Sequence, residues 1–477
     1  MNHAAWIASL PLLIVAATAI VAMIGIAIGR SHRATAAISV FGLALALVSL
    51  WPARESGAIS LGPLLLIDSY ALIYMGIVMA ASLFVVLLSF PYLERRSEHK
   101  EEFYLLLLLA TLGSMALAAS THMASFFLSL ELLSISLYAL IAYPRTEMPA
   151  LEAGIKYLIL AASSSAFLLF GLALIYVAQG NMEFARMSAA LQQPTGEFAY
   201  LAGIVLVMTG IGFKLAVVPF HLWTPDVYQG APLPVTAFVA TVSKGGVFAF
   251  LLRWLSVGGA STFALPLTLT IVSIASMLVG NLLALRQTNI KRLLAYSSIA
   301  HMGYFLVAVI AGRGLGTTAA TYYLAAYMAT ILGAFGCLLA LSQTTRETET
   351  FDDVRGLFWR RPAIAGVFTA MILSLAGIPL TAGFLGKFYV LTAGASATAW
   401  TLIIVLIVSS TIGLVYYLRV IVAMFAEEAE LRAEPAGIGI SPGIALGALT
   451  IALFVLGVYP GPLWNAISEA ASALGAG

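Results

Sequence analysis

The stretch GIVLVMTGIGFKLAVVPFHLWTPDVYQGAPLPVTAFVATVSKGG, residues 203–246, places two lysines inside apolar segments that read as membrane spans. Lys214 lies in the first segment, shortly before Pro219, and Lys244 lies in the second. A lysine near the middle of a bilayer costs about 2.5–3.5 kcal/mol on insertion scales, so it is kept where it faces a partner or a water-filled cavity. We interpret this stretch as part of an ion or proton path.

The composition of the whole chain is that of a polytopic membrane protein. Its 477 residues are 61% hydrophobic and 9% charged, whereas soluble domains carry about 25% charged residues. The net charge of +2 gives no indication of a nucleic-acid partner. The single cysteine, Cys337, excludes a disulfide framework and a cysteine-ligated iron–sulfur or zinc site made by this chain alone. No glycine-rich nucleotide-binding motif follows a strand-like run, so redox or nucleotide chemistry must belong to other chains.

Apolar stretches of about 20 residues predict an all-α polytopic membrane protein with about fourteen transmembrane helices. The expected spans are 4–29, 34–52, 70–92, 103–119, 122–143, 150–178, 199–221, 232–254, 264–286, 291–311, 317–342, 362–393, 398–425 and 440–466. The twelfth span, 362–393, is too long for one crossing. It contains GIPLTAGFLG, which predicts a break in the helix.

The basic residues outside the spans predict the orientation, because Lys and Arg collect in cytoplasmic loops. Loops after odd-numbered spans hold fourteen of them: Arg30, Arg33, Arg95, Arg96, Lys100, Arg145, Arg286, Lys291, Arg292, Arg346, Arg355, Arg360, Arg361 and Arg432. Loops after even-numbered spans hold four: Arg54, Arg186, Arg253 and Arg313. Both termini are therefore expected on the outer side of the membrane. The remaining five, Lys156, Lys214, Lys244, Lys387 and Arg419, lie within spans.

The chain is expected to form one membrane domain, 1–477, that contains an internal repeat. We divide it into 1–102 with three spans, repeat one at 103–256, repeat two at 257–430, and 431–477 with the last span. Because the repeats are five spans apart, they have opposite orientation. Spans 199–221 and 362–393 hold the same place, and each pairs a lysine with a Pro- or Gly-containing break, which is typical of inverted-repeat transporters. The alternative is that Pro and Gly are simply common in membrane helices.

Four residues are the main candidates for chemistry. Glu131, in SFFLSLELLSISLYAL, is a carboxylate near mid-membrane and needs a partner, for which we expect Lys214. Such a pair changes its charge state if the partners separate, although a static ion pair is the alternative. Lys244 and Lys387 are expected to exchange protons with buried water. Together the four predict a hydrophilic axis that passes protons through the membrane.

Three further residues have two open interpretations each. Lys156 lies near the start of the span 150–178. It either takes part in the proton relay or extends its charged end to the membrane surface. His221, close to Pro219, either tunes proton uptake or is structural. His301, in SSIAHMGYF, either bridges Lys244 and Lys387 or is a hydrogen-bonded structural histidine. Nothing in the sequence indicates an ATP site, so the energy for transport must come from an ion gradient or a partner protein.

Several of these motifs resemble the antiporter-like membrane subunits of respiratory complex I. They are SLELLSISLYAL, EAGIKYLILAASSSAFLLFGLALIY, the block GFKLAVVPFHLWTPDVYQGAPLPVTAFVATVSK, RLLAYSSIAHMGY and GIPLTAGFLGKF. The resemblance covers nearly the whole chain. The helix around Lys156, and the stop soon after the last span, are most similar to the subunit N branch of the bacterial NADH–quinone oxidoreductase family. The family's conserved glutamate and lysines match Glu131, Lys214, Lys244 and Lys387.

The resemblance implies a proton-translocating subunit of an NADH–quinone oxidoreductase with no redox site or cofactor of its own. FMN, iron–sulfur clusters and quinone are then expected in partner subunits, and other complex I membrane subunits, especially antiporter-like ones, as neighbours. The implied location is the bacterial inner membrane with both termini periplasmic. We hypothesise proton uptake from the cytoplasm near spans 199–221 and 232–254 and outward release near Lys387. The rival is a subunit of a multisubunit cation/proton antiporter without redox partners, and a purely structural scaffold would leave the buried lysines unexplained.

Overall fold

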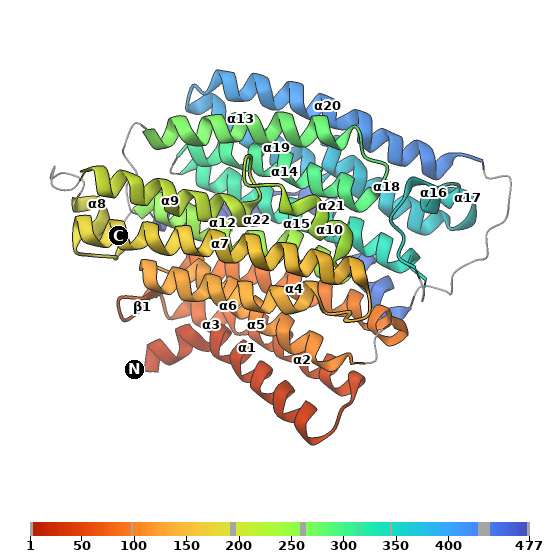
Figure 1. The fold of residues 1–477 in the computed structure, drawn as a ribbon, viewed down its shortest axis with the longest axis horizontal. Coiled ribbons are helices and arrows are strands. Elements are labelled where there is room, and N and C mark those ends of the chain that lie inside the picture. The colour runs from red at the N-terminus through yellow and green to blue at the C-terminus, as the bar shows by residue number, and fades with distance from the viewer. Residues whose placement is uncertain are drawn as a thin grey trace.

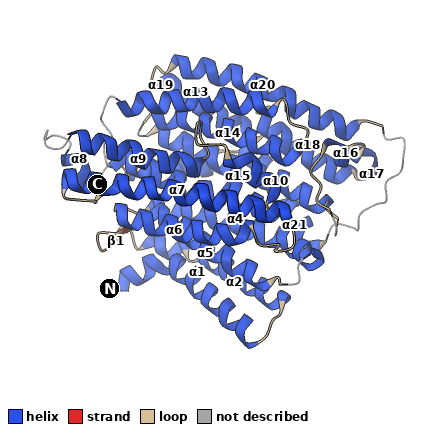
Figure 2. Cartoon of the chain, viewed as in Figure 1, coloured by secondary structure: helices blue, strands red, loops and turns tan. Residues whose placement is uncertain are grey.

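The protein is a bundle of long helices with one small β-hairpin at one end (Figures 1 and 2). This computed structural model describes residues 3–96, 99–190, 197–257, 264–312, 314–343, 346–427 and 439–474. Arg313 and Arg432, two of the arginines used above to predict the orientation, lie outside the described residues.

The elements follow the apolar pattern of the sequence. Their bounds are α1 (His3–Ile28), α2 (His32–Val48), α3 (Leu50–Glu55), β1 (Ile59–Leu61), β2 (Leu65–Ile67), α4 (Ser69–Arg96), α5 (Glu101–Ala119), α6 (Met123–Ile141), α7 (Met148–Gln179), α8 (Phe184–Ala190), α9 (Glu197–Leu215), α10 (Trp223–Gly230), α11 (Leu233–Phe238), the π-helical turn η1 (Val239–Ser243), α12 (Lys244–Val257), α13 (Ala264–Ala284), α14 (Ile290–Ile310), α15 (Leu315–Leu341), α16 (Phe351–Val354), α17 (Leu357–Arg360), α18 (Pro362–Ala376), α19 (Ala382–Ser396), α20 (Trp400–Phe425), α21 (Ile440–Val458) and α22 (Gly461–Ala473). Strands β1 and β2 pair antiparallel.

The described part of the chain has 13 helices that are long and apolar enough to cross a membrane. The remaining predicted span is divided into two shorter helices, α18 and α19, on either side of the predicted break. The prediction of an all-helical membrane protein with about fourteen spans is thereby confirmed. Its division into two inverted repeats stays a prediction.

The helices that carry the candidate residues are the most enclosed. The segment Leu233–Val257, which joins α11, η1 and α12, is buried throughout its most apolar window, and α14 and α15 are almost as deeply buried. By contrast, α1, α7 and α21 expose most of their surface, as membrane-facing helices do. In Figure 1 the first group runs through the middle of the bundle. Lys244 therefore lies in the core of the protein rather than at its lipid-facing surface.

Both interrupted helices break at a residue held in the left-handed backbone region. Between α9 and α10, Ala216 has φ 60°, and between α18 and α19, Leu380 has φ 73°. For a residue other than glycine this conformation costs about 1–2 kcal/mol. Packing around each break must hold it in place, so the breaks are built features of the fold and not frayed helix ends.

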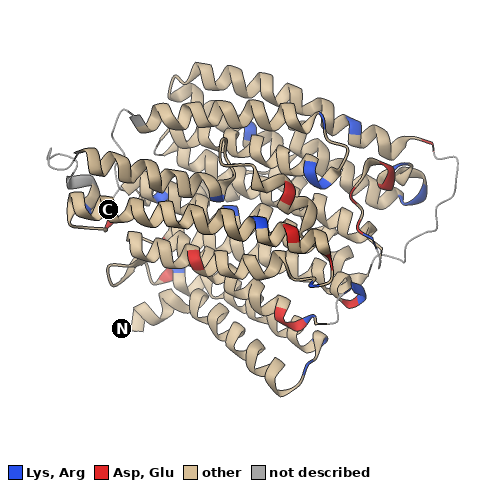
Figure 3. Ribbon diagram, viewed as in Figure 1, with Lys and Arg blue, Asp and Glu red and all other residues tan. Residues whose placement is uncertain are grey.

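The two ends of the bundle differ in charge. Helix α1 begins and α22 ends at the same end of the bundle (Figure 1). Toward the opposite end, Figure 3 shows clusters of Lys, Arg, Asp and Glu. The orientation of the two termini in the membrane stays a prediction.

Two basic residues assigned to loops are in fact buried on helices. Lys291 lies at the start of α14 and Arg253 within α12, each 1% exposed. Arg253 donates to both carboxylate oxygens of Asp68, from Nη1 at 2.9 Å and from Nη2 at 2.6 Å. The loop assignments were wrong because apolar stretches locate helix ends only to within a few residues, and burial depends on neighbouring helices.

Candidate functional site

Lys214 lies in the last turn of α9, directly before the first break. Its Nζ donates to Ser134 Oγ on α6 at 2.7 Å. The rings of Tyr157 and Phe213 lie 5.4 Å and 5.7 Å from the same nitrogen, within the range of a cation–π interaction. Hydroxyl and aromatic faces thus replace water around this buried charge.

The expected direct pair between Glu131 and Lys214 is not formed. The carboxylate of Glu131 accepts from Ser165 Oγ on α7 at 2.6 Å and makes no ion pair among the described residues. Ser134, one turn along α6 from Glu131, accepts the hydrogen bond from the Lys214 ammonium group instead. The carboxylate still lies close enough to act on Lys214 electrostatically. The predicted direct contact was therefore wrong, but the two residues do lie in one neighbourhood.

The polar groups freed by the first break find partners in neighbouring elements. The backbone N–H of Val218 donates to Ser276 Oγ on α13 at 2.9 Å. The indole N–H of Trp223 donates to the carbonyl of Phe213 at 2.9 Å. These bonds satisfy backbone groups that a continuous helix would have paired internally. They hold Lys214 at the end of a fixed half-helix.

Lys244 directly follows the π-helical turn η1. Its Nζ donates to Ser298 Oγ on α14 at 2.6 Å. Ser298 also shares a 2.6 Å hydrogen bond with the hydroxyl of Tyr327 on α15. A single π turn widens an α-helix and is frequent at functional sites. Here it precedes a lysine that is only 1% exposed.

His301 lies deeper on α14 with both ring nitrogens occupied. Nδ1 is 2.7 Å from the hydroxyl of Tyr323, and Nε2 is 3.1 Å from the hydroxyl of Tyr417. A neutral imidazole donates at one nitrogen and accepts at the other, so exchanging the two roles moves a proton across the ring. Lys244 and Lys387 both lie within electrostatic reach of it. The bridging role of His301 stays a prediction.

Lys387 lies on α19 and reaches back to the end of α18. Its Nζ donates to the carbonyls of Leu375 and Ala376 at 2.9 Å each, and to Ser410 Oγ on α20 at 2.8 Å. The last carbonyls of a helix have no partner within it and carry the negative end of the helix dipole. The second break thus creates the site that holds this lysine.

Lys156 and His221 are placed differently. Lys156 forms ion pairs with Glu152 at 2.8 Å and Asp226 at 3.0 Å, and its side chain is 44% exposed. It therefore lies at the surface, apart from the buried lysines. His221 is buried in the first break, and its Nδ1 has no hydrogen-bond partner within the described part of the chain. Neither position decides between a functional and a structural role.

The hydroxyl groups around the lysines were missed from sequence. They are Ser134, Ser165, Ser298, Ser410, Tyr323, Tyr327 and Tyr417. No spacing signal identifies these hydroxyl groups, because each lies on a different helix from its partner in these hydrogen bonds. Within the described ranges, no three His, Cys, Asp or Glu side chains gather as a metal site.

Discontinuous helices and buried lysines together define the class of antiporter-like membrane subunits. Residues 120–413 match the family described as "NADH:quinone oxidoreductase/Mrp antiporter, TM". A chain of the respiratory complex I from Thermus thermophilus is 33% identical and superimposes with a TM-score of 0.81, covering 97% of this chain and 99% of that one. The membrane-bound sulfane sulfur reductase, an archaeal respiratory membrane complex, has a chain that is 26% identical, with a TM-score of 0.85 over 99% of this chain and 97% of that one.

Within this class the relationship is narrower. NADH-quinone oxidoreductase subunit N from Ectopseudomonas mendocina is 48% identical over 476 residues, 98% of this chain and 96% of that protein. The chain therefore belongs to the subunit N family, the antiporter-like membrane subunits of respiratory complex I. A chain of the Mrp complex from Dietzia sp. DQ12-45-1b, 22% identical with a TM-score of 0.87 over 98% of this chain and 97% of that one, shares the fold.

Proposed function

We propose that this subunit moves protons through the membrane along Glu131, Lys214, Lys244 and Lys387, driven by NADH oxidation and quinone reduction in its partner subunits. One observation carries the proposal. The three lysines are 3%, 1% and 7% exposed, and none forms an ion pair with a carboxylate among the described residues. Each ammonium group is held by hydroxyl, carbonyl or ring contacts alone.

A buried ammonium group without a counter-ion is poorly stabilised in its charged form. It gains modest hydrogen-bond energy but no ion-pair energy, so a change in nearby charge is enough to make it release or bind a proton. The arrangement favours proton exchange at these three positions over a static role.

Glu131 supplies the nearby charge. It is half-buried in this chain and accepts its hydrogen bond from Ser165 on α7, a helix that exposes most of its surface. We propose that other complex I membrane subunits, antiporter-like ones among them, cover this face. A charge change at that contact would then reach Lys214 first and Lys244 next.

The membrane location follows from the apolar spans, and the finer placement is part of the proposal. We propose the bacterial inner membrane with both termini periplasmic, on the asymmetry of basic loops. FMN, iron–sulfur clusters and quinone are proposed to reside in other subunits of the complex. The alternative is a cation/proton antiporter without redox partners, which a shared fold permits, but 48% identity over the chain favours the complex I assignment.

The relay is tested in assembled complex. Lys214→Ala, Lys244→Ala and Lys387→Ala are each expected to lower proton pumping and quinone reduction about tenfold or more, as for loss of a proton-transfer group. Lys100→Ala, which changes a lysine outside the membrane core, is the matched control. Normal pumping in all three variants, with normal assembly on native gels, would sink the proposal.

The redox assignment has a separate test. The tagged chain is purified from native membranes, and NADH-reducible flavin and iron–sulfur absorption are recorded. Chromophores that co-purify with NADH–quinone activity support complex I. A colourless preparation that requires sodium for transport would support the antiporter alternative.

A further inference from the structure

A buried ion pair near the charged end of the bundle has no part in the proton relay proposed above. Glu347, in the loop after α15, accepts from Lys291 Nζ at 2.7 Å. The side chains are 13% and 1% exposed, respectively. Buried charges of this kind are costly and need full hydrogen bonding to persist.

Two other elements complete the surroundings of the Glu347 carboxylate. From α4, the hydroxyl of Tyr92 donates at 2.6 Å, and the guanidinium of Arg96 forms an ion pair at 3.7 Å. From α11, the backbone N–H of Leu233 donates at 3.0 Å. The other acidic groups of this loop face elsewhere: Glu349 accepts from Asn289, and Asp353 pairs with Arg346.

A line of buried polar groups leads from this pair toward Lys244. Lys291 also donates to the carbonyl of Ala231 at 2.8 Å, and the Thr236 hydroxyl lies 3.3 Å from the same oxygen. Thr236 reaches the carbonyl of Tyr228 at 3.1 Å, and the hydroxyl of Tyr228 lies 3.4 Å from Ser298 Oγ.

Ser298 is the group that accepts from Lys244, so the line ends at the relay. Lys291 and Ser298 lie seven residues apart on α14, which is about 10 Å along the helix axis. The polar groups between them belong to α10, to α11 and to the link that joins these two helices.

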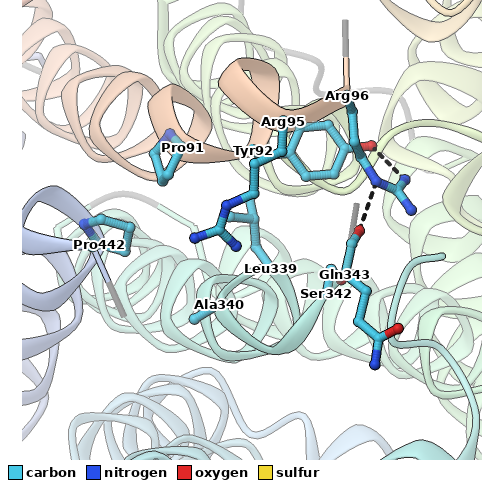
Figure 4. A pocket seen from close by; sticks show the side chains of 10 residues that line it. Pro91, Tyr92, Arg95, Arg96, Leu339, Ala340, Ser342, Gln343 and Pro442 are labelled. Carbon is cyan, nitrogen blue, oxygen red and sulfur yellow. Dashed lines mark hydrogen bonds between the residues drawn. The ribbon is translucent and has the colours of Figure 1, made fainter. Parts of the chain in front are cut away.

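A surface pocket lies at the ends of α4 and α15 and the start of α21. Figure 4 shows Tyr92 and Arg96 in this pocket, with Arg96 bonded to the Tyr92 hydroxyl and to the carbonyl of Gln343. Both residues also contact Glu347. The pocket therefore brings the surface to within one side chain of the buried carboxylate.

We propose that Glu347 and Lys291 form a proton-loading site that feeds Lys244; this inference rests on the relay proposed above. When Lys244 is deprotonated, the Lys291 ammonium group releases its proton inward to water that binds along the polar line, because the carbonyls of Ala231 and Tyr228 accept hydrogen bonds but have no proton to pass on. Glu347 then keeps only its longer, 3.7 Å ion pair with Arg96 and binds a proton that arrives from water through the pocket. That proton passes to Lys291 and restores the ion pair. Each cycle takes up one proton at the surface and delivers one to Lys244.

The test compares Glu347→Gln with Glu347→Asp in the assembled complex. Glutamine keeps an acceptor for the Leu233 N–H and the Tyr92 hydroxyl but cannot carry a proton, whereas aspartate can. We expect Glu347→Gln to lower the rate of proton pumping by about tenfold, with a deficit that grows as pH rises because reloading depends on proton supply. Glu347→Asp is expected to recover part of the rate. Glu349→Gln, in the same loop, is the control.

Two results would overturn the inference. One is wild-type pumping by Glu347→Gln at every pH between 6 and 9. The other is an equal loss in both variants that follows the amount of assembled complex, since Glu347 would then be a structural clamp only. If Lys244→Ala abolishes pumping while Glu347→Gln does not, the relay stands and only the loading site fails. If neither variant matters, both proposals fail.

Discussion

Lys214 donates its hydrogen bond to Ser134, not to Glu131, although the two α6 residues lie one helical turn apart. The carboxylate is held by Ser165 on α7 instead. The charges are therefore neighbours without being a closed ion pair.

This geometry makes Ser134 a positioning residue for Lys214. A hydrogen bond from a charged donor contributes about 1.5–3 kcal/mol. Ser134→Ala is therefore expected to lower proton pumping several-fold while leaving assembly intact, because only one hydroxyl is lost. Ser136→Ala is the matched control, since that hydroxyl donates to the carbonyl of Leu132 in its own helix. Equal pumping rates for the two variants in vesicles would argue against the role.

The second break depends on a close approach at Gly383. A Cβ added there would lie 2.0 Å from the carbonyl oxygen of Ser374, which backbone cannot accommodate without shifting. Overpacking of this kind costs about 1–3 kcal/mol, and the shift would displace the carbonyls that hold Lys387.

Gly383→Ala is therefore expected to lower the thermal stability of the complex and to reduce pumping. A Cβ at Gly366, on the first half of the same interrupted helix, would meet nothing within 4 Å, so Gly366→Ala is the control. Thermal unfolding of both purified variants measures the difference. A Gly383→Ala complex as stable as the control would show that the break tolerates the shift.

The buried pair of Arg253 and Asp68 is expected to matter for folding rather than for transport. Arg253 also donates from Nε to the carbonyl of Ala118 at 3.1 Å, so its charge is satisfied from two sides. Removing one partner of a buried pair costs about 3–5 kcal/mol because the other charge stays buried alone.

Asp68→Ala should then reduce the amount of assembled complex on native gels. The exposed pair Arg54–Glu469, with side chains 60% and 67% exposed, supplies the control, because surface pairs contribute about 0–1 kcal/mol. Glu469→Ala should assemble normally. Normal assembly of Asp68→Ala would mean that the site relaxes or admits water.

The loop after α15 is expected to loosen in acid. Burial alone would raise the pKa of Glu347, but the charge and hydrogen bond of Lys291 outweigh it and hold this pKa below its ordinary value. A carboxyl group with a lowered pKa stabilises the folded state above its ordinary pKa of about 4.3. That stabilisation is lost as pH falls from there through the lowered value.

Amide hydrogen exchange in the peptide that contains Glu347, corrected for intrinsic rates, measures this effect. Protection of wild-type complex should exceed that of Glu347→Gln at pH 7, and the difference should shrink below about pH 4. A difference that is unchanged between pH 7 and pH 3.5 would contradict the assignment of the stabilisation to the ionised carboxylate.

The sequence by itself determined the spans, the two breaks and the lysines on them. Hydropathy is a local property, so fourteen apolar stretches can be read without knowing how they pack. The cost of burying a charge is local too, which is why Lys214, Lys244 and Lys387 stood out before any helix was placed. Pro219 and the GIPLTAG stretch are local signals too, and they predicted the two breaks.

Only the tertiary structure decided which groups these charges meet. Ser298 lies 54 residues from Lys244, and Glu347 lies 56 residues from Lys291, so no pattern along the chain joins them. The face that a helix turns inward depends on the helices packed around it. That packing buried Lys291 at the start of α14 and left Glu131 without direct contact with Lys214. It also brought the hydroxyl groups of Tyr323 and Tyr417 to the ring nitrogens of His301.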